Sequence, residues 1–459
     1  MYRIATLITF YLFQLVLLGI GIKIHPALML GIPAIMIIVI YLIYNPMLCL
    51  LLFVLSGIVK EFFINVIPFF QVIDYSLLFT ILIWIGLMRI YLIGEWKIPN
   101  WSKSILITYL LFCTFLLFTG FYTPSPNYGW LKIFRFIVFN STMFITPFII
   151  IRSIIDSKRL LILLRNVLII IALLMIFYIL YYLSITSGIS FLLRVSILGA
   201  NPITVGSFIA IAVGMIAVLM VKNSFKKWVL YLPLLIILLI GLLSTGSRGP
   251  IISLLLGIGI YFLFFERESW GKIFWLSGIL IFTIILLLFI LPDNLTTRYL
   301  NYTTGDLVIQ REGVKRVSTI AMRLQYWELS ISEWLRNFRT FLFGVGSGGF
   351  SSFYIMRDYR FYPHNMFIEV IIELGLLGLS LFLIFWYKIS KVLFRLYNNL
   401  SIVSAMWITA FLIRFFGSQF SGDIGGNRDM WLYLSLVLIS TNFEQLRFSP
   451  YAIKSIGPK

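Results

Sequence analysis

The residue best suited to chemistry in this chain stands at the start of a long apolar run. His364 is one of only two histidines in 459 residues, and it lies between Pro363 and Asn365. Proline fits the first turn of a helix, so His364 is expected at the N-terminus of a helix. Histidine changes charge near neutral pH, which makes His364 a candidate general base. A surface histidine beside a helix-capping residue would give the same pattern.

Two acids follow His364 inside the apolar run. Asn365, Glu369 and Glu373 recur at four-residue spacing and therefore share one face of a helix. Carboxylates inside a membrane helix are costly unless they face a polar cavity or a charged partner. We therefore expect this face to point into the protein and to support the histidine.

Two arginines have surroundings suited to binding an anion. Arg248 lies in "LLSTGSRGPII", where Ser, Thr and Gly allow backbone amides to converge on an anion. Arg323 lies in "MRLQYWE", one turn before Trp327. A guanidinium group binds phosphate through two parallel hydrogen bonds. Arg248 could equally be a turn arginine that extends to the membrane surface, and Arg323 a solvated charge on an amphipathic helix.

Other residues could assist, but nothing in the sequence ranks them, and ordinary surface charge explains each equally well. The further arginines that could contact an anion are Arg194, Arg357, Arg360 and Arg428. The outer tyrosines that could stack on a ligand ring are Tyr354, Tyr359 and Tyr362.

The sequence lacks the motifs of metal, nucleotide-phosphate and dinucleotide sites. The sequence has no DxD motif and no His/Asp cluster with metal-ligand spacing, and His25 is far from His364. It also has no P-loop and no dinucleotide-binding glycine pattern. We therefore expect no metal and no cofactor, and any reaction would use a substrate that is already activated. The net charge of +19 comes from dispersed basic residues, which disfavours nucleic acid as a partner.

The composition defines the fold class. The chain is 61% hydrophobic and 12% charged, and several stretches of about 17 to 25 residues are almost free of charge, which is the length that spans a bilayer. We predict an all-α polytopic membrane protein with about 12–14 transmembrane helices. The two cysteines lie inside apolar runs and read as small hydrophobic residues. The first run shows no signal-peptide cleavage site. The apolar segments are 4–22, 27–44, 46–59, 72–93, 104–122, 136–152, 161–184, 203–221, 228–246, 250–265, 273–291, 365–387, 402–419 and 430–442.

Basic loops suggest an orientation. Placing the N-terminus in the cytoplasm puts most short basic loops inside, as the positive-inside rule requires, and puts the long basic stretch 292–363 outside. We divide the chain into N-terminal transmembrane helices (1–200), core transmembrane helices (201–291), this extracytoplasmic loop (292–363) and C-terminal transmembrane helices (364–459).

The long outer loop has its own expected structure. Apolar residues at helical spacing predict an amphipathic helix lying at the membrane interface. The sequence "GVGSGGF" after this helix predicts a tight, flexible turn. The apolar positions of the helix are Leu324, Trp327, Ile331, Trp334 and Leu335.

Taken together and in this order, these motifs resemble the bacterial O-antigen ligase and O-antigen polymerase superfamily. "SRG" ends one outer turn, an "R…YW" segment precedes "GVGSGGF", and "HNMFIEVIIELGLLGL" opens the next helix. The resemblance covers about Asn201 to Gly378, and its specific part is "GVGxGxF…HN…ExGLLGL". "SRG" alone would be weak, and the N-terminal half matches only in being a series of spans.

The resemblance implies a membrane-embedded, inverting, metal-independent glycosyltransferase. Such enzymes use a glycan carried on undecaprenyl diphosphate at the outer face of the bacterial inner membrane. By family pattern His364 would be the general base, Arg248 and Arg323 would hold the diphosphate, and Asn365 would orient His364 or a sugar. Partners would be the lipid-linked donor, a glycan acceptor or lipid A core, membrane lipid and a possible chain-length regulator.

Four functions remain open at this point, and the last of them, a non-catalytic scaffold, predicts that His364→Ala is harmless. The first is polymerisation of lipid-linked repeat units into O-antigen or capsular polysaccharide, favoured because the N-terminal half diverges. The second is ligation of the finished glycan to lipid A core by the same chemistry. The third is a lipid-linked glycan flippase, which would need a cationic cavity reachable from both faces of the membrane. Here Arg248, Arg323 and His364 all map to the outer side.

Overall fold

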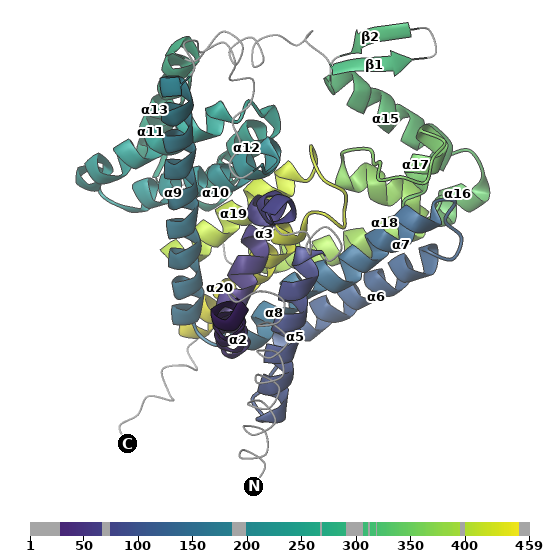
Figure 1. Cartoon of the computed structure of the whole chain (residues 1–459), viewed down its shortest axis with the longest axis horizontal. Coiled ribbons are helices and arrows are strands. Elements are labelled where there is room, and N and C mark those ends of the chain that lie inside the picture. Colours follow the sequence, from purple (N-terminus) through teal and green to yellow (C-terminus); the bar gives the residue numbers. More distant parts are fainter. Residues whose placement is uncertain are drawn as a thin grey trace.

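The computed structural model describes residues 28–66, 74–185, 199–266, 269–290, 306–310, 313–317, 319–394 and 400–448. Nearly all of these residues are helical (Figure 1). Ten of the described helices are long and apolar enough to cross a membrane, and two shorter apolar helices cover Pro33–Tyr44 and Ile402–Gly417. The all-α polytopic class is confirmed. The expected span 4–22 lies outside the described residues.

The first half of the chain forms a series of helices that runs from α2 to α13. Their bounds are α2 (Leu28–Tyr44), α3 (Pro46–Val66), α5 (Tyr75–Leu92), the 3-10 turn η1 (Asn100–Ser102), α6 (Lys103–Thr119), α7 (Pro126–Phe134), the π-helical turn η2 (Arg135–Asn140), α8 (Ser141–Ile150), α9 (Ile154–Ile185), α10 (Pro202–Lys222), the 3-10 turn η4 (Phe225–Lys227), α11 (Trp228–Ser244), α12 (Arg248–Phe265) and α13 (Trp270–Ile290).

The second half begins with a small antiparallel hairpin and returns to helices. Strands β1 (Asp306–Gln310) and β2 (Gly313–Val317) pair in a register that places Asp306 opposite Val317. The helices that follow are α15 (Thr319–Trp334), α16 (Phe338–Phe343), α17 (Gly349–Tyr354), α18 (Met366–Phe394), α19 (Ile402–Gly417) and α20 (Arg428–Phe448).

Local sequence signals explain where several helices begin. Asp74 caps α5, because its side chain accepts a hydrogen bond from the backbone N–H of Ser76 at 2.8 Å. Asn201 caps α10 in the same way, and Pro202 occupies the first helical position, where its missing N–H costs nothing. Asn337 forms a capping box with Thr340 at the start of α16.

The core is centred on α10 and α19. Every residue of α10 from Val205 to Val221 is buried, so this helix is enclosed by protein on all sides. Helix α19 packs against α10, α12 and α20, and α20 continues onto α8. Gly257 of α12 allows this close packing, since a Cβ atom there would lie 2.7 Å from the backbone nitrogen of Ile413.

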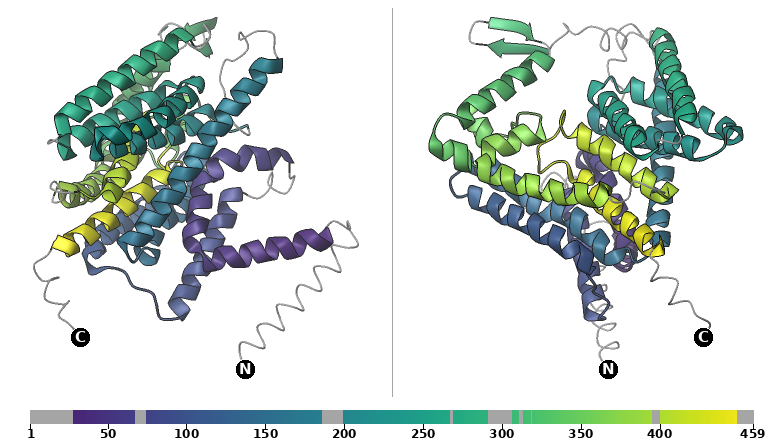
Figure 2. Two further views of the ribbon diagram at one scale, coloured as in Figure 1. Left: turned by 90° about the vertical axis from the view of Figure 1, so that its left-hand side faces the viewer. Right: turned by 180° about the vertical axis from the view of Figure 1, so that it is seen from behind.

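Helix α15 lies at the edge of the apolar bundle and packs against α18, and the β1–β2 hairpin precedes its N-terminal end (Figures 1 and 2). It is amphipathic as predicted, but its two tryptophans do not share the exposed face. Trp327 donates to the carbonyl of Pro363 at 3.0 Å, and Trp334 donates to the carbonyl of Phe341 at 2.9 Å. The exposed apolar residues are instead Leu324, Ile331 and Leu335. The indole groups therefore fasten the helix to the protein.

The glycine-rich turn after α16 packs against a kink in α18. Gly375 interrupts that helix with φ 64° and ψ −164°, a conformation that is essentially restricted to glycine. The backbone N–H groups of Val345 and Gly346 donate to the carbonyls of Ile372 and Glu373, both at 2.9 Å. Gly344 has a similar conformation, and a Cβ on Gly344 or Gly375 would collide with the other segment. The predicted turn is therefore present, but it is buried and hydrogen-bonded.

We predict that Gly375→Ala destabilises the protein. A side chain there forces a strained backbone, worth about 1–3 kcal/mol, and also separates the turn from α18. Thermal unfolding of the detergent-purified protein measures the effect. Gly259→Ala is the matched control, because no atom lies within 4 Å of a Cβ atom at that helical position. Equal melting temperatures for the two variants would contradict this explanation of the kink.

Candidate functional site

His364 lies immediately before α18. The helix begins at Met366, so Pro363 and His364 precede its first turn, and Asn365 is the capping residue. The Asn365 side-chain oxygen accepts hydrogen bonds from the backbone N–H groups of Phe367 at 3.0 Å and Ile368 at 3.1 Å. This oxygen is therefore occupied in capping, which limits the expected role of Asn365 in orienting His364 to fixing the backbone beside it.

The backbone of His364 adopts a conformation that side chains other than glycine rarely take. Its φ is 59°, in the left-handed region. Residues held in such conformations are concentrated at functional sites, where surrounding contacts enforce them. Here Asn365 caps α18 on one side of His364, and Trp327 holds the Pro363 carbonyl on the other.

The imidazole of His364 is surrounded by aromatic rings and charges. It packs against Tyr362, with ring centroids 4.5 Å apart, and lies nearly parallel to Tyr326 at 6.3 Å. Burial, together with the charges of Arg323 and Arg360, lowers the pKa of His364 to about 4, and Asp423 acts in the opposite direction. The ring is therefore neutral at physiological pH. Its Nδ1 atom is buried and has no hydrogen-bond partner among the residues that the structure describes.

Arg323 reaches His364 from α15. Positions 323 and 327 are one helical turn apart, so α15 presents both Arg323 and the anchoring Trp327 to the same loop. Burial lowers the pKa of Arg323, and the neighbouring Tyr362 and Tyr326 act in the opposite direction. An arginine so placed, partly withdrawn from water, is suited to bind an anionic oxygen.

Asp423 brings a second arginine to the histidine. Its carboxylate accepts hydrogen bonds from Arg360 at 3.3 and 3.4 Å and from the hydroxyl of Tyr128 at 2.8 Å. Burial opposes ionisation of Asp423, but Arg360 and Lys132 lower its pKa below the usual value. Arg360 is 45% exposed, so one side of its guanidinium is open to solvent.

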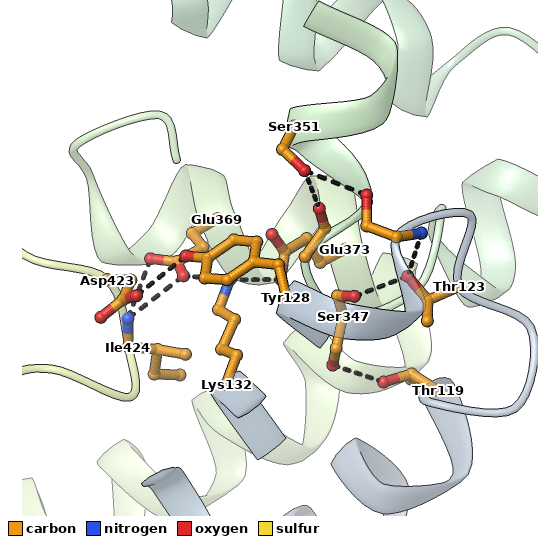
Figure 3. Close-up of polar contacts among 12 residues, drawn as sticks. Thr119, Thr123, Tyr128, Lys132, Ser347, Ser351, Glu369, Glu373, Asp423 and Ile424 are labelled. Atoms are coloured by element: carbon orange, nitrogen blue, oxygen red, sulfur yellow. Dashed lines mark hydrogen bonds and ion pairs between the residues drawn. The ribbon is translucent and has the colours of Figure 1, made fainter. Parts of the chain in front are cut away.

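The two acids of α18 share one buried lysine (Figure 3). Nζ of Lys132 in α7 contacts Glu369 and lies 2.5 Å from Glu373, and all three side chains are fully buried. Glu369 also accepts from the backbone N–H of Ile424, 3.1 Å from each of its oxygens. The expectation that these acids would face a partner is confirmed, and the partner is Lys132. Among the described residues, their polar contacts are to Lys132 of α7, to the backbone of Ile424 and, from Glu373, to the backbone of Gly348; none is to His364.

The polar contacts continue from this lysine to the glycine-rich turn (Figure 3). The hydroxyl groups of Thr119 and Ser347 lie 2.7 Å apart, and Thr123 donates to the carbonyl of Ser347 at 2.6 Å. The hydroxyl oxygens of Ser125 and Ser351 are 3.0 Å apart, which is hydrogen-bonding distance. The connection between α6 and α7 therefore fixes the segment that leads from α16 to His364.

The other sequence candidates are not part of this cluster. Arg248 begins α12, and its neighbour Gly249 lies near Phe420 of the Ser418–Asn427 loop, so Arg248 flanks this loop from α12. It is not among the charges that act on His364. Arg357 and Tyr359 are exposed. Arg194 lies outside the described residues.

Sequence reasoning missed Lys132 and Asp423. Lys132 and Arg135 are the two cations of an otherwise apolar segment, "GWLKIFRF", and a cation there signals a buried acidic partner. Asp423 stands in "SGDIGGN", where glycines surround one acid between two apolar runs. The described residues contain no group of three or more His, Cys, Asp or Glu side chains arranged to hold a metal ion.

Comparison with known families bears on the same segment. The family model described as O-antigen ligase matches residues 233–383. The match supports a relation of this region to the O-antigen ligase and polymerase superfamily. No curated protein matches the chain. The matched region contains Arg248, Arg323, Arg360 and His364, whereas Lys132 and Asp423 lie outside it.

We predict that Lys132→Met strongly destabilises the protein. The change leaves two buried carboxylates without a counter-ion, which typically costs about 3–5 kcal/mol. Adding Glu369→Gln and Glu373→Gln removes the excess charge and should recover much of the loss. Lys388→Met is the control, because Lys388 is half-buried and donates hydrogen bonds to Ser104 and Thr108, with neither partner a carboxylate. Thermal melts of the purified variants test this, and a stable single variant would refute it.

Proposed function

We propose that this protein is a membrane glycosyltransferase that polymerises oligosaccharide repeat units carried on undecaprenyl diphosphate. The observation that supports this most directly is the neutral His364 placed beside Arg323 and Arg360. A neutral imidazole can accept a proton, and two arginines can bind the two phosphates of a leaving group. The match of residues 233–383 to the O-antigen ligase family supports the same reaction class.

The proposed reaction is a single inverting displacement. An acceptor hydroxyl oxygen attacks the anomeric carbon of the donor glycan while its proton passes to the imidazole of His364. The bond between that carbon and the diphosphate oxygen breaks, and the lipid diphosphate leaves with the electron pair. Arg323 and Arg360 stabilise the charge that develops on it, and fixed donors of this kind contribute about 3–4 kcal/mol each. The step requires no metal, because the arginines supply the positive charge.

Donor binding would also make His364 a better base. Arg323 and Arg360 lower its pKa in the free protein. A diphosphate bound to these arginines adds negative charge beside the ring and so raises that pKa toward neutrality. The donor thereby activates the base that acts on the acceptor, which favours transfer only when both substrates are present.

Arg248 and the aromatic residues receive secondary roles. Arg248 flanks the Ser418–Asn427 loop from α12, where it would contact the diphosphate from the other side. Tyr354 and the exposed Tyr359 would contact sugar rings of the glycan. We propose that the site faces outward from the bacterial inner membrane, because the orientation expected from the positive-inside rule puts the polar segment 319–365 and the Ser418–Asn427 loop on that side.

A ligase is the second candidate, favoured by the family description itself. It would use the same residues on the same donor and transfer the glycan to lipid A core. A flippase is less well supported, since the cations that we single out gather at one end of the helices. A chain-length regulator is a further possible partner of the polymerase.

The first experiment asks which acceptor the protein uses. Purified protein receives undecaprenyl diphosphate-linked repeat units as its sole substrate in the presence of a metal chelator. We expect a ladder of products on a gel, because each unit then serves as both donor and acceptor. No ladder, together with glycan transfer after lipid A core is added, would identify a ligase. No transfer to either acceptor by protein that binds the donor would overturn the proposal.

The same assay tests the roles of individual residues. His364→Ala should reduce turnover about 100- to 10,000-fold with donor binding retained, because only the base is lost. Arg323→Ala should weaken both donor binding and turnover. Arg336→Ala is the control, since Arg336 is an exposed arginine of the same outer segment that pairs only with Glu333. Normal polymer synthesis by well-expressed His364→Ala protein would rule out the assignment.

A further inference from the structure

A lateral groove lies between α5 and α8, away from His364. It has a volume of about 350 Å³ and an almost wholly apolar lining. Trp84 and Met88 of α5 form one wall, Ile145 and Thr146 of α8 form the other, and Trp96 lies at one end. Both helices belong to candidate membrane spans, and they pack side by side. None of the residues proposed for glycan transfer lines this groove.

The groove opens toward the surroundings of the bundle. Trp84 is 53% exposed and Met88 57% exposed, although both lie on a helix apolar enough to span a membrane. The wall is fixed in place, because Trp84 donates from its indole nitrogen to the hydroxyl of Thr142 across the groove at 2.7 Å. Such a preformed apolar groove in a membrane span meets lipid, not water.

The shape of the groove matches an extended hydrocarbon chain. Its lining runs along two turns of each helix, from Trp84 to Tyr91 and from Ser141 to Ile149. This corresponds to about 10–12 Å along the helix axes at 1.5 Å per residue. The helices cross the membrane, so the long axis of the groove follows the direction of lipid acyl chains. The small side chains of Ser141, Thr142 and Thr146 provide its depth.

The basic residues at the Trp96 end of the groove indicate that a bound lipid has an anionic headgroup. Exposed Lys97 follows Trp96 directly, and Arg152 follows the end of α8. Arg152 pairs with Glu95 at 2.8 Å, and Arg159 lies 3.9 Å from Asp156, so the positive excess at this end comes from Lys97. Ile149 is 17 residues beyond Lys132 on the α7–α8 segment, about 25 Å along its axis. The groove therefore lies in the membrane leaflet opposite the His364 site, where basic loops attract anionic lipid.

We propose that this groove binds one acyl chain of an anionic phospholipid, whose phosphate lies against Lys97 and Arg152. The occupied groove would fill the space between α5 and α8 and stabilise their packing. The site is independent of glycan transfer, so its failure would leave the proposed function untouched.

Native mass spectrometry of the full-length protein, stripped of lipid in detergent, tests the proposal. We expect one molecule of phosphatidylglycerol to rebind at least tenfold more tightly than phosphatidylcholine. Ile145→Trp fills the groove and should abolish this binding. Ile85→Trp is the control, because Ile85 is an exposed residue of α5 outside the groove. Met88→Trp serves as a second filling variant if the first fails to fold.

The outcomes separate cleanly. Lys97→Gln should reduce the preference for phosphatidylglycerol without changing the affinity for phosphatidylcholine. Equal binding of phosphatidylglycerol by wild type and the filling variants would overturn the site. Equal affinity of the wild type for the two lipids would overturn the headgroup assignment, and tighter binding of undecaprenyl phosphate would overturn the choice of occupant.

Discussion

The contact of Lys132 with Glu369 and Glu373 is the constraint on which the rest of the site depends. Three charged groups are fully buried inside candidate membrane spans, where each would be costly without the others. Together they fasten α7 to α18. Glu369 also binds the Ser418–Asn427 loop, because it accepts a hydrogen bond from the backbone N–H of Ile424. Well-packed apolar residues can match a buried ion pair in stability, so this one is better understood as a positioning device.

A chain of contacts connects the Lys132 cluster to His364. The Ser418–Asn427 loop carries Asp423, which binds Tyr128 of α7 and Arg360 from the outer segment. Arg360 and Asp423 both act electrostatically on His364. The position of His364 is also fixed by the glycine-rich turn, whose backbone hydrogen-bonds to the kink of α18. Trp327 fixes it further by donating a hydrogen bond to the carbonyl of Pro363. The histidine is thus positioned by α7, α15 and α18 at once.

The sequence was informative where a residue is unusual within its own segment. His364 is scarce and stands beside a capping residue, and the acids of α18 are conspicuous in an apolar run, so local reasoning found them. The glycine motif was found in the same way, but its partner was not, because the kink at Gly375 depends on a backbone contact between separate segments. Apolar spacing predicts that the tryptophans of α15 face the membrane, but the structure shows that they contact protein. The spacing alone cannot distinguish a protein surface from a membrane surface.

What the sequence could not supply was long-range pairing. Lys132 and Glu373 are 241 residues apart, and no periodicity relates them. Asp423 follows a separate apolar run, and only the folded chain brings it to Arg360. Arg248 shows the opposite error, because its local motif suggests a place in the site. The structure puts it beside the Ser418–Asn427 loop, and it is not among the charges that act on His364.

The central claim is that a neutral His364 lies beside two arginines, Arg323 and Arg360, which we propose bind a diphosphate. Because the chain has only two histidines, His25→Gln leaves a single imidazole for ¹⁵N-histidine NMR. We predict that the pKa of His364 is about 4 in the free protein and rises when undecaprenyl diphosphate is added, since the ligand offsets the charge of Arg323 and Arg360. A pKa near 6.5 that does not respond to the diphosphate would contradict the account.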